Sequence, residues 1–542
     1  MAGIPRPWRS STMTTTDPAQ TPATPRPWLV LGVYCAGFFT ALLDGTIVNI
    51  AVPALIGGLG ATYDQVLWVL DAYLLVFTVL LITAGRLGDV FGHRRLFLTG
   101  VTLFTAASAL CGLAGSGGWL LAARVLQAVG AALLFPQVIS TILTVFPGPV
   151  RGRAFGVFGA IAGLAPVAGP IAGGLILDHL GWRWIFLINV PIGVVTIALA
   201  LIHAPAGRPA AGQGLDLTGV ALATAGLTAV VFGLIEGERH DWGTIAGPIS
   251  IGSVLVAGVA LLALFGLWER RRGGRALIPP ALFAARDFAL GNGVGFAFHA
   301  GMMAIPLVVV LYLQTARGHG PLETGLTLLP GAALTALGSA WSGRLSDRYG
   351  GAPILAAGLA TLAAGLVVLV LTAGPRGGAW SALPGLIVIG IGNGATYAPL
   401  QQVTMDGVDP RLAGAASGVA NTIRQVGAVV GLAVLGALLS TRLSAAVPDE
   451  AARQAALLPA HLREGFLAAA ADGAARFSPP APPPGLGAGE AALFRRLGQE
   501  AFTTAFTAAM HTTLLVTAAV LAAAAACCVL LLRRPELAVR RG

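Results

Sequence analysis

The stretch GRLGDVFG at residues 85–92 recurs as GRLSDRYG at residues 343–350. The two copies share Gly, Arg, Leu, Asp and Gly in register, and each follows an apolar segment long enough to span a membrane. Such a repeat indicates two homologous helical bundles related by an axis along the membrane normal. The glycines allow close helix approach, and each aspartate can accept from helix N-terminal amides or pair with a nearby arginine.

We expect these two loops to switch conformation. The residues concerned are Gly85, Arg86, Asp89, Gly92, Arg94, Gly343, Arg344, Asp347 and Gly350. The alternative is a pair of tight basic loops that only orient the chain, and the repetition in register argues against it.

Composition places the chain among membrane proteins. Of its 542 residues 56% are hydrophobic and 10% charged, which leaves too little polar surface for a soluble globule. Apolar segments of spanning length recur at 28–52, 68–84, 96–115, 119–138, 154–177, 184–203, 217–235, 247–268, 289–313, 323–341, 353–373, 381–402, 414–439 and 511–532. The sequence therefore predicts an all-α polytopic protein with fourteen spans.

Arginines gather in alternate connections between these segments, as the positive-inside rule requires of cytoplasmic loops. This pattern predicts a multi-pass protein of the cell membrane with both termini cytoplasmic, and it assigns the net charge of +10 to topology, so no nucleic acid partner is expected. The chain contains no lysine, which excludes a P-loop and hence ATP-driven transport by this chain alone. No metal-binding or hydrolase motif occurs, and we expect neither a cofactor nor enzymatic activity.

The predicted domains follow from the segments. Residues 1–27 and 534–542 are expected as cytoplasmic tails, the first of them disordered, and residues 204–288 as a connector with two inserted helices. Residues 28–203 form the first six-helix bundle, and residues 289–440 with 511–533 form the second. The connection 441–510, with its proline-rich SPPAPPPGLG, is expected outside the membrane as short helices around a semi-rigid turn.

One carboxylate lies deep in the first apolar run. Asp44, in LDGTIVNIAVP at 43–53, is about 24 Å past Trp28 in a core of about 30 Å. An ionised aspartate in hydrocarbon costs about 2.5 to 3.5 kcal/mol on insertion scales, so Asp44 is a functional-site hypothesis. Arg124 lies about 8 Å below the outer end of the fourth segment, at a similar depth. The two would form a pair, or Arg124 would reach outward to the interface.

Further motifs follow in order: GRLGDVFGHRR, LAARVLQAVGAA at 121–132, GLAPVAGPIAGG at 163–174, GWRWIFLINVPIG at 181–193 and ASGVANTIRQVGAVVG at 416–431. Together with LDGTIVNIAVP, they resemble the fourteen-span drug:proton antiporter branch of the major facilitator superfamily. The resemblance covers nearly the whole chain except the N-terminal tail and residues 441–510. It implies a major facilitator fold of two six-helix bundles plus two inserted central helices, and export of amphipathic compounds driven by proton entry.

The resemblance also suggests site residues. It supports coupling roles for Asp44 and Arg124, with either as the group that controls the proton, because a conformational change that alters burial or pairing converts proton binding into a change of state. The antiporter pattern of the fifth span would comprise Gly163, Pro166, Gly169, Pro170, Gly173 and Gly174, with an ordinary packing face as the alternative. Candidates for a substrate cavity are Asp71, Tyr73, Gln127, His299, Asn393, Tyr397, Asn421, Arg424 and Gln425.

Most of these polar groups have a simpler interpretation as interhelical hydrogen-bonding side chains, and Asp71 as a solvated carboxylate at the interface. The predicted function is a proton-coupled multidrug exporter for lipophilic or cationic compounds, which would have drugs or toxic metabolites, protons and the lipid bilayer as its partners. The alternatives are a secondary transporter, exporter or symporter, of one small metabolite or antibiotic and, more remotely, a membrane-embedded sensor or enzyme. The sequence leaves open the cargo, the proton stoichiometry, the oligomeric state and the role of residues 441–510.

Overall fold

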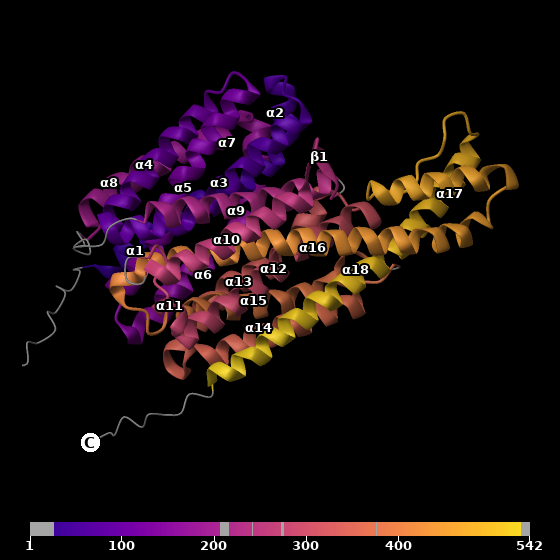
Figure 1. Cartoon of the computed structure of the whole chain (residues 1–542). Helices are drawn as coiled ribbons and strands as arrows, with labels where there is room; N and C mark the ends of the chain where they lie inside the picture. Colours follow the sequence, from indigo (N-terminus) through magenta and orange to yellow (C-terminus); the bar gives the residue numbers. More distant parts are fainter. Residues whose placement is uncertain (1–25, 206–215, 241, 273–275, 376, 533–542) are drawn as a thin grey trace, which may run out of the picture.

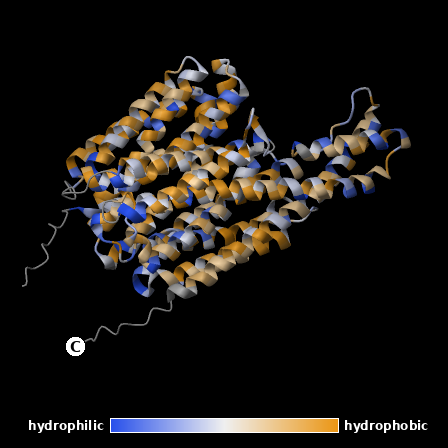
Figure 2. Ribbon diagram, in the orientation of Figure 1, coloured by the Kyte–Doolittle hydropathy of each residue, from blue (hydrophilic) through white to orange (hydrophobic). Residues whose placement is uncertain are grey.

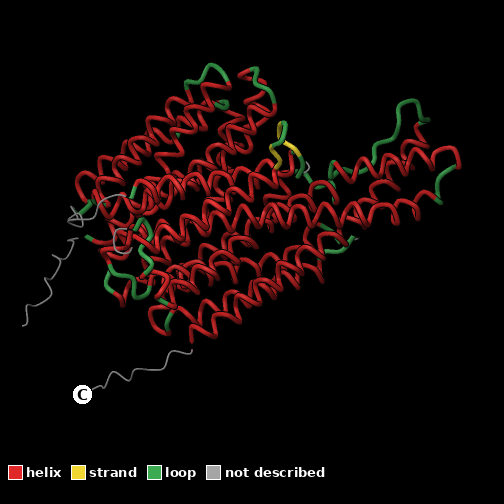
Figure 3. The backbone as a smooth tube through the Cα atoms, in the orientation of Figure 1, coloured by secondary structure: helices red, strands yellow, loops and turns green. Residues whose placement is uncertain are grey.

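The structure is a computed structural model that describes residues 26–205, 216–240, 242–272, 276–375 and 377–532. Helices make up almost all of it, and a short β-hairpin accounts for the described strands (Figure 3). The predicted tail 534–542 lies outside the described residues, and so does the predicted tail 1–27 except for residues 26 and 27.

The first bundle follows the predicted pattern of apolar segments. Helix α1 has a proline in its first turn, where a missing backbone N–H costs nothing, and α3 begins with a capping box between Thr62 and Gln65. The elements are α1 (Pro27–Ile47), η1 (Val48–Ala51), α2 (Val52–Leu59), α3 (Tyr63–Phe91), α4 (His93–Gly112), α5 (Gly117–Val145), α6 (Gly148–Leu180), α7 (Arg183–Leu187) and α8 (Asn189–His203).

Two helices follow before the second bundle. They are α9 (Leu217–Arg239) and α10 (Ile251–Arg272), joined by strands β1 (Thr244–Ala246) and β2 (Ile249–Ser250). Helix α9 packs on α10 and also contacts α3 and α16, so it touches both bundles (Figure 1). At one end Arg239 of α9 binds Asp71 of α3 at 2.5 Å, and at the other end Trp268 of α10 donates to Asp216 at 2.8 Å.

The second bundle repeats the arrangement of the first. Its elements are α11 (Ala281–Ala284), α12 (Arg286–Leu311), η3 (Tyr312–Ala316), α13 (Pro321–Tyr349), α14 (Gly351–Thr372), η4 (Ala379–Ala382), α15 (Leu383–Met405), η5 (Pro410–Leu412), α16 (Ala413–Ala455), α17 (Ala460–Ala475) and α18 (Ala488–Leu532). The last glycine of each motif copy ends a helix at positive φ, 96° for Gly92 after α3 and 87° for Gly350 after α13, a conformation that favours glycine. We call the end of the molecule that carries both copies the motif end.

Twelve helices in the described part of the chain are long and apolar enough to cross a membrane. Figure 2 shows hydrophobic residues along most of the helices and hydrophilic residues mainly near their ends. The predicted spans 154–177 and 323–341 form α6 and α13, of 33 and 29 residues, which are not among the twelve. The count of fourteen spans therefore stays a prediction.

The connection 441–510 differs from the expected loop of short helices. Helix α16 continues without a break to Ala455 and α18 begins at Ala488, so both extend past the other helices, and α17 packs against them (Figure 1). Alanine has the highest helix propensity, and the alanine-rich flanks propagate the two helices out of the bundle. Phe466 and Phe494 are fully buried in this extension, with ring centroids 5.0 Å apart, so it has a core of its own.

Candidate functional site

An ion pair lies inside the first bundle. Asp44 of α1 is 0% exposed and Arg124 of α5 is 1% exposed, and one guanidinium nitrogen binds the carboxylate directly. The expected contact is therefore present in the structure. Two charges so far from water are tolerated only with good geometry and further hydrogen bonds, so the neighbouring polar groups decide how this pair is held.

Amide side chains supply those hydrogen bonds. Gln127, one helical turn after Arg124, donates to the second Asp44 oxygen at 2.9 Å and accepts from Arg124 at 2.8 Å. Asn189, the first residue of α8, donates to the same Asp44 oxygen at 2.9 Å. Ser108 of α4 accepts from both amides at 3.1 Å and donates to the Phe186 carbonyl at 2.9 Å. Side chains of α5 and α8 thus bind the carboxylate of α1, and α4 supports the two amides.

Aromatic rings cover the guanidinium. The Arg124 carbon Cζ lies 4.1 Å from the ring centroid of Tyr73 and 5.8 Å from that of Phe186. The Tyr73 hydroxyl donates to the Ala41 carbonyl at 3.3 Å, which fixes the ring against α1. A cation over an aromatic face gains electrostatic stabilisation when both are desolvated. Tyr73 is therefore part of this ion-pair site.

The sequence analysis missed Asn189 and Ser108. Asn189 lies in the quoted motif GWRWIFLINVPIG, where it is the one amide in an apolar run, and this was the available signal. The sequence gives no such signal for Ser108, because a lone serine in a membrane helix is common and can bond to many different partners. Gln127, expected as a candidate for the substrate cavity, instead bonds to both members of the ion pair.

The two motif copies join the bundles at the motif end. Asp89 of α3 accepts from the backbone amides of Gly414 and Ala415 in the first turn of α16. Asp347 of α13 accepts from the amides of Gly152 and Arg153 near the start of α6. A carboxylate at a helix N-terminus is stabilised by the helix dipole and by the free amides there. Each motif copy thus binds a helix of the other bundle.

The motif glycines make this approach possible. A Cβ on Gly85 would overlap the Gly414 carbonyl oxygen, and a Cβ on Gly343 would overlap that of Gly152. The arginines differ between copies. Arg86 is buried, Arg94 donates to the Leu201 carbonyl at 2.6 Å within the first bundle, and Arg344 is exposed.

Comparison with known proteins fits this architecture. A family model described as Major Facilitator Superfamily matches residues 34–432. The chain belongs to the major facilitator superfamily. An uncharacterised MFS-type transporter of Mycobacterium tuberculosis is 38% identical over 456 residues, which is 82% of this chain and 77% of that protein. A probable actinorhodin transporter of Streptomyces coelicolor is 37% identical over 442 residues, 79% of this chain and 76% of that protein.

Other relatives of this superfamily member are named as antibiotic export, antibiotic resistance and multidrug resistance proteins. Among solved structures, the human organic anion transporter MFSD10 aligns with a TM-score of 0.53 over 92% of this chain and all of that chain, at 12% identity. That likeness supports the fold alone. The chain is thus a multi-pass transporter of a family whose members include antibiotic exporters, and the family gives no evidence of catalysis.

Helix α6 of this facilitator packs on both bundles through its glycines. Gly169 and Gly173 face Thr46 and Ile47 of α1, directly after Asp44, and Thr46 donates to the Ala165 carbonyl at 3.3 Å. Gly163 faces Thr335 of the second bundle. Gly174 faces open space, and the side chains of Pro166 and Pro170 lie outside the described part of the structure.

Two cavity candidates have other partners. Asp71 is neither fully solvated nor free, because its carboxylate binds Arg239 of α9 at 2.5 Å with 24% of the side chain exposed. Sequence spacing could not indicate a partner 168 residues away. Asn393 donates to Thr335 of α13 at 3.4 Å inside the second bundle, as an interhelical packing residue would.

The remaining candidates gather in the second bundle. Arg424 of α16 donates to Asn421 at 3.1 Å and to Gln401 of α15 at 2.7 Å. His299 of α12 bonds to the Gly295 carbonyl at 2.9 Å through Nδ1, and its ring lies 6.0 Å from that of Tyr397. Gln425 is half-buried beside them in the chain. We call Arg424, Asn421, Gln401, Tyr397 and His299 the Arg424 cluster.

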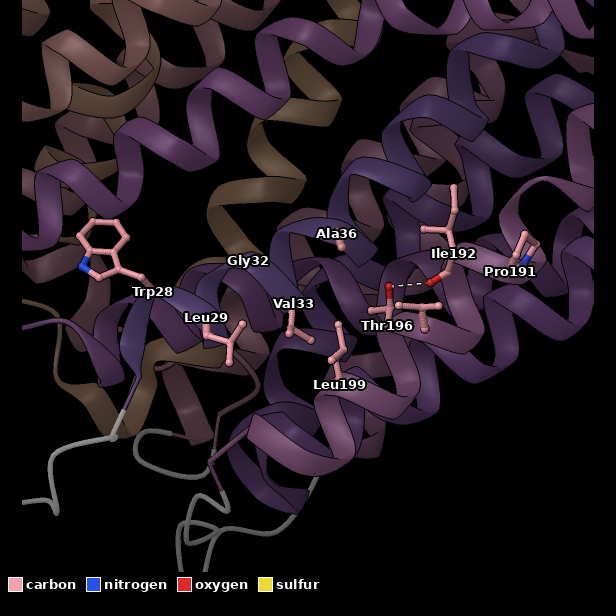
Figure 4. Close-up of a pocket in the computed structure, with 10 residues that line it drawn as sticks. Trp28, Leu29, Gly32, Val33, Ala36, Pro191, Ile192, Thr196 and Leu199 are labelled. Carbon is pink, nitrogen blue, oxygen red and sulfur yellow. Dashed lines mark hydrogen bonds between the residues drawn. The ribbon is translucent and has the colours of Figure 1, made fainter.

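The structure also has an apolar groove of about 490 Å³ between α1 and α8 (Figure 4). It is lined by Trp28, Leu29, Gly32, Val33, Ala36, Pro191, Ile192, Val195, Thr196 and Leu199. The Thr196 hydroxyl is satisfied by the Ile192 carbonyl at 2.8 Å. None of these residues belongs to the ion-pair site, although Pro191 and Ile192 follow Asn189 closely along α8.

Proposed function

We propose that this facilitator is a proton-coupled exporter of amphipathic small molecules that works by alternating access. Asp44 is the group that binds the proton, and Arg124 is its partner in the unprotonated state. The observation that carries the proposal is the buried Asp44–Arg124 pair with Gln127 and Asn189 on the second carboxylate oxygen. Intramembrane charges that are paired in this way are typical of proton relays in transporters.

Protonation of Asp44 would weaken its attraction to Arg124. A neutral Asp44 no longer attracts the guanidinium, and Arg124 keeps Gln127 as an acceptor 2.8 Å away. Helix α1 is bound to α6 through Thr46, two residues from Asp44, and α6 lies against α13 and α15 of the second bundle. A shift of α1 against α6 would thus transmit the effect of proton binding to the interface between the bundles.

The bundles are joined at the motif end in this structure. The hydrogen bonds between residues 26–205 and 286–532 of the described chain lie within about three helical turns of the two motif copies, as the pairs Asp89–Gly414 and Ser339–Gly156 illustrate. We infer that the motif end is cytoplasmic, with both termini, and that the structure corresponds to a state closed on that side. Fourteen spans, with α9 and α10 as the inserted pair, complete the proposed topology.

Transport in proteoliposomes tests the proposal. An imposed proton gradient should drive a lipophilic dye in the direction opposite to proton flow with the wild type. Asp44→Asn should keep dye binding and lose the gradient-driven component, because the amide cannot take up a proton. Asp71→Asn is the matched control, since it removes another intramembrane carboxylate that binds an arginine outside the ion-pair site. Wild-type transport by Asp44→Asn would refute the assignment of the proton site.

A second candidate is an exporter dedicated to one compound. The relative named as a probable actinorhodin transporter supports it, because that name refers to a single product and the identity is 37%. A panel of unrelated amphipathic dyes separates the two functions. Transport of several dyes with mutual competition supports multidrug export, whereas rejection of all dyes together with transport of one antibiotic class supports the dedicated exporter.

A further inference from the structure

Arg424 is a buried cation for which the described residues provide no acidic neighbour. It is 5% exposed, about 16 Å into α16 from its start at Ala413, near the middle of a bilayer core of about 30 Å. Its two hydrogen bonds go to the amide oxygens of Asn421 and Gln401. In the described part of the chain no carboxylate lies within ion-pair distance of it. Arg124 in the first bundle, by contrast, has Asp44.

The side chain lies on the face of the second bundle that meets the first. Ser417 precedes Arg424 by seven residues, or two helical turns, and so shares its face of α16. The Ser417 hydroxyl donates to the Pro136 carbonyl of α5 at 3.0 Å and lies 3.2 Å from Ser140. Tyr397 faces the first bundle as well, since a Cβ added to Gly159 of α6 would lie 3.0 Å from the Cβ of Tyr397. The Arg424 cluster is therefore at the interface where alternating access moves a substrate.

Hydrogen-bond donors dominate the cluster. A guanidinium has five N–H groups, and two of those of Arg424 are used in the bonds to Asn421 and Gln401. Because Asn421 accepts from Arg424 through Oδ1, its Nδ2 points elsewhere, and this buried nitrogen has no partner among the described residues. An arginine and an unused amide N–H side by side suit an anionic or carbonyl oxygen.

Aromatic rings adjoin these donors. Tyr397 lies edge-on to Phe298 with centroids 5.2 Å apart, and edge-on to His299 at 6.0 Å. Gly295 of α12 leaves room beside the arginine, because a Cβ there would lie 3.8 Å from Arg424 Cγ without overlap. Flat rings next to a desolvated cation suit a ligand that is itself aromatic and carries negative charge at one edge.

We propose that the Arg424 cluster is a binding site for the acidic oxygen of an aromatic organic anion, so that amphipathic anions such as carboxylates and phenolates are cargo of this exporter. The inference rests on the proposed export function and narrows its substrate class, against the expectation of cationic compounds. Binding supplies the counter-charge that the described residues do not give Arg424, and this offsets part of the cost of a desolvated guanidinium.

Binding of fluorescein and of its cationic xanthene analogue rhodamine 123, followed by fluorescence anisotropy on the purified full-length chain at mildly alkaline pH, tests the proposal. The wild type should bind fluorescein more tightly. Arg424→Gln should weaken fluorescein by about ten-fold to a hundred-fold, as expected for a lost charged hydrogen bond, and leave rhodamine 123 unchanged or tighter. Arg424→Lys keeps the charge and should retain part of the affinity. Arg442→Gln, which removes an exposed charge from the same helix, should change neither dye.

Three results would overturn the assignment: rhodamine 123 bound more tightly by the wild type, no binding of either dye, or equal loss of both dyes in Arg424→Gln. If Arg424→Gln loses both dyes equally, thermal unfolding in detergent shows whether that variant is folded. If it is misfolded, Arg424→Lys is the deciding variant: a folded lysine variant that does not bind fluorescein more tightly than rhodamine 123 contradicts the proposal. Transport under a proton gradient reports on the proposed function separately. Selective binding without gradient-driven transport would leave the site intact and reject proton coupling.

Discussion

Asp89 of the first bundle and Asp347 of the second each accept hydrogen bonds from backbone amides of the opposite bundle, and so join the two bundles by the same kind of contact. Asp89 accepts from Gly414 and Ala415 at 2.7 and 2.8 Å, and Asp347 accepts from Gly152 and Arg153 at 2.7 and 3.0 Å. Each carboxylate belongs to a motif that the chain carries twice, and each accepts hydrogen bonds from backbone amides of the other bundle. The Arg153 side chain lies a further 3.8 Å from Asp347. The contact therefore depends on the closeness of two helices, which makes it a latch between bundles.

Loss of one latch should loosen the motif end. We expect Asp89→Asn to weaken two hydrogen bonds to a charged acceptor, each worth about 1.5 to 3 kcal/mol, and to speed amide hydrogen exchange at 413–419 by at least about ten-fold. Exchange followed by mass spectrometry in detergent measures this. Asp409→Asn is the control, because the Asp409 carboxylate accepts from the Arg411 amide within the second bundle. Equal exchange in both variants would show that the latch does not hold the bundles.

The ion pair should be strongly coupled in stability. Arg124→Gln leaves Asp44 as a buried charge without its partner, and we expect a loss of about 3 to 5 kcal/mol in the free energy of unfolding. Adding Asp44→Asn to that variant should restore most of the loss, since two neutral amides replace the pair. A double-mutant cycle on chemical unfolding in detergent gives the interaction energy. Additive effects of the two changes would mean that the pair does not act as a unit.

Two glycines of α6 should respond differently to alanine. Gly169→Ala places a methyl group against the Thr46 hydroxyl beside Asp44, and we expect a loss of about 1 to 3 kcal/mol together with reduced transport. Gly174→Ala enters open space on the same helix and should be neutral or slightly stabilising. Thermal midpoints and dye efflux measure both. Similar behaviour of the two variants would remove the argument that packing on α1 explains the glycine pattern.

The extension built by α16, α17 and α18 should behave as a small folded unit. Phe466→Ala removes a fully buried ring that packs on Phe494, and such truncations cost about 3 to 5 kcal/mol. Trypsin should then cut faster after Arg463 and Arg476, while the membrane helices stay intact. Leu457→Ala, at a side chain that is 65% exposed, is the matched control. Unchanged cleavage in Phe466→Ala would indicate that this core contributes little.

The fold follows closely from local sequence signals. Apolar length predicted helices at the segments that the structure shows as helices, and the repeated Gly-Arg-Leu motif indicated two bundles. The ends of two helices differ from the expected boundaries. Helices α16 and α18 run past the expected boundaries because alanine continues a helix whether or not the surroundings are lipid.

Part of the candidate site could be predicted from the sequence and part could not. Asp44 and Arg124 were identifiable because a charge in an apolar run is costly and so stands out in the sequence. Asn189 and Ser108 were not, because a neutral polar residue in a helix has many possible partners at comparable cost.

The sequence by itself determined which residues are helical, that Asp44 and Arg124 lie within apolar segments, and that the chain is built from two related halves, since these depend on composition and on spacing along the chain. Only the tertiary structure decided partners. It placed Asp71 against Arg239, brought Asn189 to Asp44 across 145 residues, and brought the amide oxygens of Asn421 and Gln401 to Arg424. The physical reason is that a hydrogen bond depends on about 3 Å of separation between two atoms, and distance between helices is set by packing of the whole bundle.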